Sequence, residues 1–368
     1  MIPVHAYPKQ VKERTPVMAG YHVAVVGATG AVGQEMLAIL QERKFPVKSL
    51  RLLASKRSVG KSFPFKGESI EVQELKRNSF RGIDIALFSA GADRSKQFAQ
   101  AAVKAGAVVI DNSSAFRMEK AVPLVVPEIN AQEIQNHKGI IANPNCTTIV
   151  TLMGLYPLRP YGIRRLILSS YQAVSGAGAW AIEELRRQTL EWALQEIKNA
   201  TMGTKETAIL RPEKFPHQIA FNLIPHIDRF LEGGYTKEET KCLLESRKIL
   251  AQPNLQVSAT TVRVPVFRSH SVSVHLETEK PLSVPKARSL IRKAKGVQLY
   301  DQPEKSKYPT PIQVAGKDDC LVGRIRKDET VPNGLCLWIV GDQLRKGAAL
   351  NAIQIAESLL GVSPKGKG

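Results

Sequence analysis

The sequence is poor in cysteine and in long apolar runs, and each shortage excludes a class of protein. Its 368 residues contain four cysteines, with no Cys-x-x-Cys pair and no histidine cluster beside them. This pattern argues against a disulfide framework and against a zinc site, so we expect no metal. No apolar run approaches the ~20 residues that span a bilayer, so we expect no membrane association.

Acidic residues are also scarce relative to basic ones. The chain has 52 Lys and Arg against 33 Asp and Glu, a formal net charge of +19. Such a charge can attract nucleic acid, an anionic surface or anionic small molecules. Aromatic residues make up only 6% and do not cluster with the cations, which argues against a nucleic-acid-binding protein. The surplus of positive charge has no explanation in the sequence.

Residues 1–20 are expected to form a short N-terminal extension. They lack the apolar stretch of a secretory signal and contain too little serine to favour a transit peptide. The few cysteines fit a reducing compartment. We therefore predict a cytoplasmic protein.

From residue 21 onward, short apolar runs alternate with stretches of helical periodicity. Strands are expected at 22–26, 50–54, 84–88, 107–110 and 139–142, and helices at 31–41 and 94–104. This alternation predicts an α/β fold with a mostly parallel sheet and helices on its faces.

After residue 143 longer strands are mixed with helices, which predicts a second domain of the α+β class. Strands are expected at 164–170, 257–266, 271–277, 320–326 and 335–340, and helices at 180–199, 236–251, 285–295 and 342–360. Residues 297–319, with several prolines and scattered charge, are expected to form the longest loop.

A glycine-rich turn follows the first predicted strand. It reads Gly27-Ala-Thr-Gly30-Ala-Val-Gly33 and opens the first predicted helix. Glycines there allow a tight turn, and the free amides of the helix N-terminus favour a pyrophosphate. The spacing departs from the strict Gly-x-Gly-x-x-Gly pattern, so a tight turn without a ligand is the alternative.

The end of the second predicted strand lacks the acidic residue that usually binds the ribose of NAD. It reads Ala54-Ser-Lys-Arg-Ser-Val-Gly-Lys61, with three cations and two hydroxyls. This composition suits a 2′-phosphate and favours NADP over NAD. The alternative is a solvated basic loop.

Cys146 differs from the other three cysteines in its surroundings. It lies in Asn143-Pro-Asn-Cys-Thr-Thr148, a turn followed by a helix-compatible apolar stretch. A helix N-terminus lowers the pKa of a thiol below about 8.5, and its amides can hold an oxyanion. Cys242, Cys320 and Cys336 are interpreted as inert core residues.

Arg263 and His270 are seven residues apart in Arg-Val-Pro-Val-Phe-Arg-Ser-His. On an unbroken strand they would face opposite sides, so a bend is needed to bring both into one pocket. His270 alone could be a structural histidine. A thiol nucleophile elsewhere makes it a candidate acid–base partner.

Together these motifs resemble the aspartate-β-semialdehyde dehydrogenase family, from about residue 21 to about residue 360. The matching segments, in order, are VGATGAVG, ASKRSVGK, FSAGA, DNSSAFRM, VPLVVPEIN, NPNCTT, YQAVSGAG, EETK, TVRVPVFRSHS, VGRIRKD and DQLRKGAALNA. The resemblance implies a fold like that of glyceraldehyde-3-phosphate dehydrogenase: residues 21–145 and 342–368 form a Rossmann-type NADP-binding domain, and residues 146–341 form a catalytic and dimerisation domain.

The resemblance also implies a reaction, the reversible NADPH-dependent reductive dephosphorylation of L-4-aspartyl phosphate to L-aspartate 4-semialdehyde. The product feeds the synthesis of lysine, methionine, threonine and diaminopimelate. In this reading Cys146 forms a thioester, His270 removes the thiol proton and later handles the protons of the hemithioacetal, and Gln172 orients the reacting groups.

Substrate contacts are implied in the same way. Arg263 matches the guanidinium that holds the substrate α-carboxylate, and Glu238 matches the carboxylate that meets the amino group. Arg117 and Lys241 match the cations that receive the leaving phosphate, and Asn112 is a neighbouring candidate.

The implied cofactor contacts form a larger set spread over both domains. They are Gly27, Thr29, Gly30, Ala31, Val32, Ser55, Arg57, Ser58, Ser89, Ala90, Gly91, Ser175, Gly176 and Asn351. The family is dimeric or tetrameric, so a homodimer or homotetramer is expected. The alternative functions are N-acetyl-γ-glutamyl-phosphate reductase and a reductase of the malonyl-CoA type, although Glu238 and Lys241 favour the aspartyl substrate.

Overall fold

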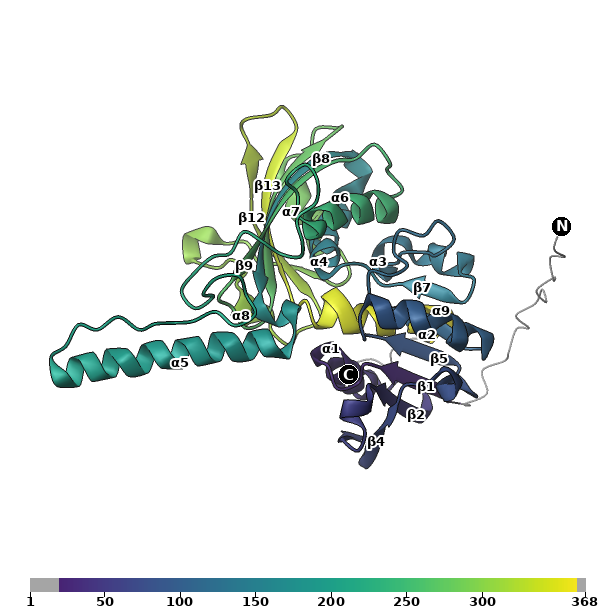
Figure 1. The fold of residues 1–368 in the computed structure, drawn as a ribbon. Helices are drawn as coiled ribbons and strands as arrows, with labels where there is room; N and C mark the ends of the chain where they lie inside the picture. Colours follow the sequence, from purple (N-terminus) through teal and green to yellow (C-terminus); the bar gives the residue numbers. More distant parts are fainter. Residues whose placement is uncertain (1–19, 363–368) are drawn as a thin grey trace.

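Two β-sheets organise the chain in the computed structural model, which describes residues 20–362 (Figure 1). The predicted N-terminal extension therefore lies outside the described residues, apart from residue 20. The first sheet has the strand order β3-β4-β2-β1-β5-β6-β7, and only the β3–β4 pair is antiparallel. The second has the order β11-β12-β13-β10-β8-β9 and is mixed. The predicted α/β class is confirmed.

The first sheet and its helices come from the N-terminal part of the chain and from its last helix. Their bounds are β1 Tyr21–Val26, α1 Ala31–Glu42, β2 Val47–Ala54, β3 Ser62–Phe65, β4 Glu68–Glu74, β5 Ile85–Phe88, α2 Ala92–Lys104, β6 Val108–Asp111, α3 Pro127–Asn130, β7 Ile140–Ala142 and α9 Leu350–Leu360.

The second sheet and its helices come from the rest of the chain. Their bounds are α4 Cys146–Leu155, β8 Ile163–Ala173, α5 Ala179–Met202, α6 Lys237–Leu250, β9 Gln256–Val264, β10 His270–Thr278, α7 Val284–Arg292, β11 Val297–Leu299, α8 Pro311–Val314, β12 Cys320–Asp328 and β13 Gly334–Gly341.

Apolar burial explains both sheets. Residues 23–26 of β1 are all fully buried, as expected for a central parallel strand covered by helices on both faces. Helix α9 returns from the second sheet and joins α1 in one apolar core over the first sheet. Helices α4, α6 and α7 cover one face of the second sheet with another core. The opposite face of that sheet bears the exposed side chains of Ile167 and His275.

Three sequence predictions differ from the structure. Strands β3 and β4 were not predicted, because they form an edge hairpin that alternates polar and apolar residues over short lengths. The longest irregular stretch is residues 203–236, whereas 297–319 contains β11 and α8. The last helix is not continuous from 342, because Arg345–Ala349 forms a π-turn before α9.

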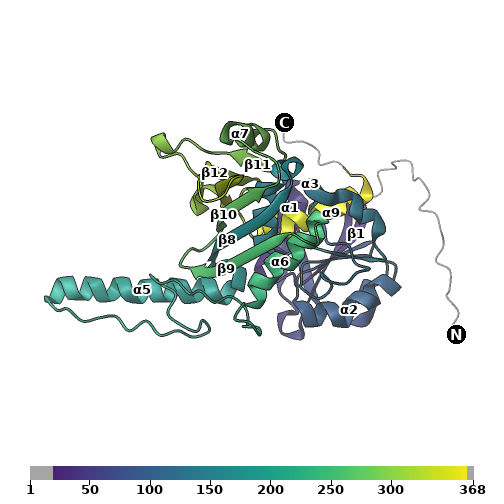
Figure 2. The same cartoon turned by 90° about the horizontal axis from the view of Figure 1, so that it is seen from above.

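Helix α5 extends from the second sheet as an arm, and residues 203–236 return alongside it (Figures 1 and 2). The return segment is fixed by two buried polar side chains of the helix. The Glu184 carboxylate accepts hydrogen bonds from the backbone amides of residues 213 and 214, and the Gln188 side-chain oxygen accepts from those of residues 219 and 220. Backbone donors that would lie buried without partners are thereby satisfied.

Arg345 connects the two halves of the molecule. Its side chain is 6% exposed and forms ion pairs with Glu35 and Glu42 of α1 and with Asp318, which precedes β12. A guanidinium can serve several carboxylates at once because its donors spread in a plane. The π-turn therefore anchors the start of the last helix to elements from both sheets.

We predict that Arg345→Met lowers the free energy of unfolding by about 2 kcal/mol, because it leaves three carboxylates without their common cation. Urea denaturation followed by circular dichroism measures the loss. Lys327→Met is the matched control, since the Lys327–Glu329 pair is largely exposed and should contribute little. Equal stability of Arg345→Met and wild type would show that the cluster does not hold the halves together.

Candidate active site

A pocket of about 480 Å³ lies where the carboxyl ends of β5, β6 and β7 meet α4, α6 and the second sheet. Ligands of open parallel sheets bind at such strand ends. Twelve of the predicted site residues line this pocket: Val32, Ser89, Gly91, Asn112, Arg117, Cys146, Gln172, Ser175, Gly176, Glu238, Lys241 and Arg263. The fold therefore brings together residues that are more than 200 positions apart in sequence.

Cys146 is the first residue of α4, as predicted. The side-chain oxygen of Asn145 caps this helix by accepting from the backbone N–H groups of Thr147 at 2.9 Å and Thr148 at 3.1 Å. The Asn145 N–H itself donates to the buried Glu245 carboxylate at 2.6 Å. These contacts fix the direction in which the thiol points.

His270 approaches Cys146 from the second sheet. Its Nε2 lies 3.5 Å from Sγ of Cys146, so the predicted pairing of thiol and imidazole is present in the geometry. Its Nδ1 lies 3.1 Å from the backbone nitrogen of Ala173, which donates to it. A neutral ring with Nδ1 as acceptor carries its proton on Nε2, the nitrogen that faces the sulfur.

Arg263 and His270 come close to Cys146 because the chain leaves β9 at Val264 and enters β10 at His270; Arg263 lines the pocket, whereas His270 is fully buried and does not. This is the bend that the spacing required. Strand β8 lies between β9 and β10, and its Gln172 pairs directly with Arg263. The Arg263 guanidinium donates to the carbonyl oxygen of Ala173 at 2.6 Å, so one backbone position contacts both side chains.

Glu238 lies at the centre of a polar cluster. One oxygen accepts from Asn145 at 2.9 Å and from Gln172 at 3.3 Å, and the other pairs with Lys241 at 3.0 Å. Lys241 also pairs with Asp228 at 2.8 Å. Burial opposes the ionisation of Glu238, but the Lys241 charge and the hydrogen bonds outweigh it and lower its pKa. The carboxylate is therefore charged at neutral pH.

Arg117 is buried and largely engaged with the protein. It donates to the carbonyl oxygens of Asn143 and Asn112 and forms an ion pair with Glu245 at 3.0 Å. Three of the five donors of its guanidinium are thereby used, and two remain. Within residues 20–362 the buried side-chain amide of Asn112 has no hydrogen-bond partner, although it lines the pocket. A buried amide of this kind is ready to meet a ligand.

The turn needs glycine for a steric reason, in addition to the ligand predicted there. Gly27 has φ of +86°, and a Cβ there would collide with the carbonyl of Ser89 at the end of β5. The turn thus sits between β1 and β5, where the strand order of the sheet reverses. Within the described chain no side chain caps the N-terminus of α1 at Gly30, so its first amides are open to an anion.

The predicted 2′-phosphate residues are accessible. Ser55 and Arg57 are exposed and Ser58 is partly exposed, just beyond the carboxyl end of β2. Asn351 differs, because it is fully buried. Its amide donates to Asn143 and to the carbonyl of Val125, and its oxygen accepts from Lys346. This places Asn351 behind Asn143 rather than in the pocket wall.

The pKa of Cys146 contradicts the sequence prediction. Desolvation and the nearby Glu238 charge raise it to about 11, and they outweigh the Arg117 and Arg263 charges that lower it. Desolvation and the Arg263 charge lower the pKa of His270 to about 3. The pair is therefore neutral at physiological pH, with a thiol beside an uncharged imidazole.

Sequence reasoning missed several residues that shape the site. Glu245 follows Glu238 and Lys241 at helical spacings of seven and four, so all three share one face of α6, a signal that could have revealed it. Asp228 lies in the irregular return segment and gave no signal. Gly347 of the π-turn would place a Cβ 3.0 Å from Cβ of Cys146, so a side chain there would press on the cysteine.

Comparisons with known proteins agree with this geometry. The family model "Semialdehyde dehydrogenase, NAD binding domain" matches residues 22–137, and "Semialdehyde dehydrogenase, dimerisation domain" matches residues 155–346. The aspartate-semialdehyde dehydrogenase of Aquifex aeolicus is 53% identical over 93% of this chain and 98% of its own length.

Two solved structures are also similar. Aspartate semialdehyde dehydrogenase II of Vibrio cholerae, complexed with ASA, superposes with a TM-score of 0.86 at 44% identity and covers 93% of this chain and 98% of its own. The enzyme of Candida albicans with NADP gives 0.69 at 25% identity and covers 92% and 98%. The chain belongs to the aspartate-semialdehyde dehydrogenase family.

We predict that Glu238→Gln lowers the pKa of the Cys146 thiol by about one unit. The change removes a nearby negative charge and also removes one of the two acids that pair with the positive charge of Lys241. The rate of alkylation by iodoacetamide is measured as a function of pH without substrate. The pH at which this rate increases should be lower in the variant than in the wild type. Cys146→Ser supplies the background, and Glu196→Gln on the exposed arm is the matched control. An unchanged profile would show that Glu238 does not set the thiol pKa.

Proposed function

We propose that this member of the aspartate-semialdehyde dehydrogenase family converts L-4-aspartyl phosphate reversibly to L-aspartate 4-semialdehyde through a thioester on Cys146. The contact between Sγ of Cys146 and Nε2 of His270, in a pocket with paired carboxylates and cations, carries this proposal. The alternative acyl-phosphate and acyl-CoA reductases are not favoured, because the relatives reported above carry the aspartate-semialdehyde name.

The thiolate of Cys146 attacks the acyl carbon of the substrate, and phosphate leaves with the electrons of the broken C–O bond. NADPH, when bound, supplies the hydride that reduces the thioester carbon. Collapse of the resulting hemithioacetal releases the aldehyde and returns the electron pair to sulfur. Asn145 caps the N–H groups of Thr147 and Thr148, so at the start of α4 the N–H of Cys146 itself is the one placed to stabilise the oxyanion of these steps.

Substrate binding itself can activate the thiol. We propose that the substrate ammonium pairs with Glu238, as the family resemblance suggests. Glu238 is one cause of the high pKa of Cys146, so its neutralisation favours the thiolate when the acyl group is in place. Without substrate, the enzyme would keep Cys146 as a protonated and less reactive thiol.

In this state His270 is better suited to donate a hydrogen bond than to accept a proton. Its Nδ1 is occupied by the Ala173 N–H, and its low pKa disfavours the imidazolium that would form on deprotonating the thiol. We propose that its Nε2–H stabilises the thiolate by a hydrogen bond, both before the attack and when sulfur leaves, and that the proton of the thiol passes to water. Gln172, bonded to Glu238, is proposed to orient the reacting groups.

The remaining contacts are proposed from charge and availability. Within residues 20–362 the Arg263 side chain forms a hydrogen bond only with the Ala173 carbonyl, so most of its donors can hold the α-carboxylate in a bidentate pair. The free amide of Asn112 and the two remaining donors of Arg117 can receive phosphate. Lys241 shares its charge with two acids, so its role there is weaker than the sequence suggested.

NADP is the proposed cofactor within a domain that binds nicotinamide dinucleotides. The glycine turn with Thr29, Gly30, Ala31 and Val32 would receive the pyrophosphate, and Ser55, Arg57 and Ser58 the 2′-phosphate. Ser89, Ala90, Gly91, Ser175 and Gly176 would border the nicotinamide side. A Cβ on Gly176 would lie 3.1 Å from Arg263 and 3.2 Å from His270, so this position must stay small.

We propose that the arm formed by α5 and its return segment contributes to a homodimer interface, which a homotetramer would repeat. Its exposed apolar side chains form a set too large for a solvated surface: Leu190, Trp192, Leu194, Ile197, Met202 and Ile209. The match to the dimerisation-domain model includes this arm.

The domain division at residues 145/146 and 341/342 and the cytoplasmic location remain proposals. No helix within residues 20–362 is long and apolar enough to cross a membrane.

The first experiment is the reverse reaction. We expect NADPH absorbance to grow when purified protein is mixed with L-aspartate 4-semialdehyde, NADP and phosphate, and to fall to background without phosphate or in Cys146→Ser. N-acetylglutamate semialdehyde is the control substrate. Turnover that needs coenzyme A in place of phosphate, or that survives in Cys146→Ser, would overturn the proposed reaction.

Arg57→Ala tests the cofactor. It should raise KM for NADP by about 10- to 100-fold, the cost of losing a charged hydrogen bond, and leave KM for NAD nearly unchanged. Lys104→Ala, at the exposed end of α2, is the matched control. An equal rise of both KM values would exclude a 2′-phosphate contact at Arg57.

A further inference from the structure

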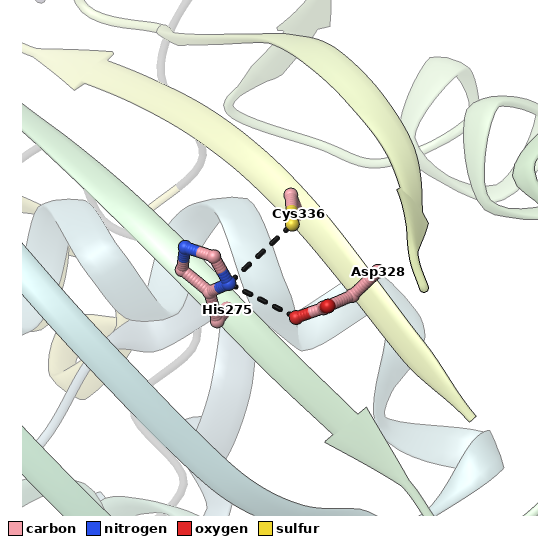
Figure 3. Close-up of side chains that lie close together, drawn as sticks. All are labelled: His275, Asp328 and Cys336. Atoms are coloured by element: carbon pink, nitrogen blue, oxygen red, sulfur yellow. Dashed lines mark hydrogen bonds and ion pairs between the residues drawn. The ribbon is translucent and has the colours of Figure 1, made fainter. Parts of the chain in front are cut away.

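Three side chains with different metal-binding atoms converge on the second sheet, outside the pocket (Figure 3). Nδ1 of His275 lies 2.9 Å from Oδ2 of Asp328 and 3.5 Å from Sγ of Cys336. The three candidate ligand atoms all lie within 4.8 Å of one another. The reaction described above uses none of them.

Sheet register causes this convergence. His275 of β10 pairs directly with Cys336 of β13, and Cys336 pairs on its other side with Arg326 of β12. Asp328 lies two residues beyond Arg326 and therefore on the same face of the sheet. Residues more than 50 positions apart in sequence thus meet as cross-strand and diagonal neighbours.

The arrangement does not fit a nucleophilic triad. In a triad the histidine uses one ring nitrogen for the nucleophile and the other for the carboxylate. Here the carboxylate and the thiol both approach Nδ1, as Figure 3 shows. The imidazole nitrogen, the carboxylate oxygen and the sulfur can each donate an electron pair, and their proximity matches what a cation needs.

We propose that His275, Asp328 and Cys336 bind a Zn²⁺ ion. In a tetrahedral site with Zn–S of about 2.3 Å and Zn–N of about 2.05 Å, the nitrogen and sulfur ligands lie about 3.5 Å apart, and nitrogen and oxygen about 3.3 Å apart. The observed separation of Nδ1 and Sγ already has this value, and that of Nδ1 and Oδ2 is about 0.4 Å shorter than the site requires. Imidazole, thiolate and carboxylate are all ligands that zinc accepts.

The surroundings prepare the site. Oδ1 of Asp328 accepts from the backbone N–H and the hydroxyl of Thr330 at 3.0 and 2.6 Å, which directs Oδ2 at His275. Asp328 and Cys336 are buried, whereas the His275 side chain is 47% exposed, so water can fill the fourth position. The charge of Arg326, the cross-strand neighbour of Cys336, repels a cation, whereas the Asp328 carboxylate and a metal-bound Cys336 thiolate would neutralise it.

Zinc binding by the full-length protein tests the proposal directly. Every variant carries Cys146→Ser, so that the active-site thiol cannot bind metal. After chelation and dialysis, we expect this parent to bind one Zn²⁺ per chain in equilibrium dialysis. With Co²⁺ it should show a thiolate charge-transfer absorption, and added Zn²⁺ should raise its melting temperature.

Removal of a ligand should abolish these signals. Cys336→Ser and His275→Ala should each weaken Zn²⁺ binding by at least about 100-fold and remove the thermal shift. Cys336→Ser should also remove the thiolate absorption band, because Cys336 supplies the thiolate. His22→Ala, at a histidine of β1, is the matched control and should bind as the parent does. His275 is exposed, so its replacement should leave the fold intact, as circular dichroism can verify.

Two results would overturn the proposal. One is a parent protein that retains no Zn²⁺ at micromolar concentration. The other is binding of equal strength in the parent, Cys336→Ser and His275→Ala, which would place the ion elsewhere. Neither result bears on the proposed reaction, because these residues do not touch the pocket.

Discussion

The site depends on holding a thiol from one side of the molecule within reach of an imidazole from the other. Cys146 follows the last strand of the first sheet, and His270 begins a strand of the second. Helix α6 secures this approach with two buried carboxylates, because Glu245 binds the Asn145 backbone and Arg117, while Glu238 binds the Asn145 side chain. Burial makes these contacts strong, and it also raises the thiol pKa to about 11. Burial thus orders the site and at the same time opposes ionisation of the thiol.

Local motifs predicted much of the fold and of the site. The glycine turn, the helix N-terminus at Cys146 and the bend between Arg263 and His270 follow from residue types at short range. The partners of Arg345 and the pairing of Asp228 with Lys241 could not be predicted, because tertiary packing brings distant segments together. The same applies to His275 and Cys336: the sequence argument against a metal considered neighbouring positions, whereas strand register joins residues that are 61 positions apart.

Charge in the pocket is more balanced than the sequence suggested. Arg117 and Lys241 are both paired with buried or half-buried acids, so the least compensated cation of the three that meet an anionic substrate is Arg263. Pairing keeps the two cations oriented, but the carboxylates also neutralise part of their charge. The net charge of +19 therefore resides mostly outside the pocket and remains without a catalytic explanation.

The backbone of Ala173 contacts both sides of the chemistry: its N–H donates to His270 and its carbonyl accepts from Arg263. Its methyl group takes no part in either contact. An alanine scan of the enzyme would therefore pass over this position, although its backbone sets the tautomer of His270 and the direction of Arg263. Only a change in the main chain, such as an ester in place of the amide, would reveal how much of the site is encoded in the backbone.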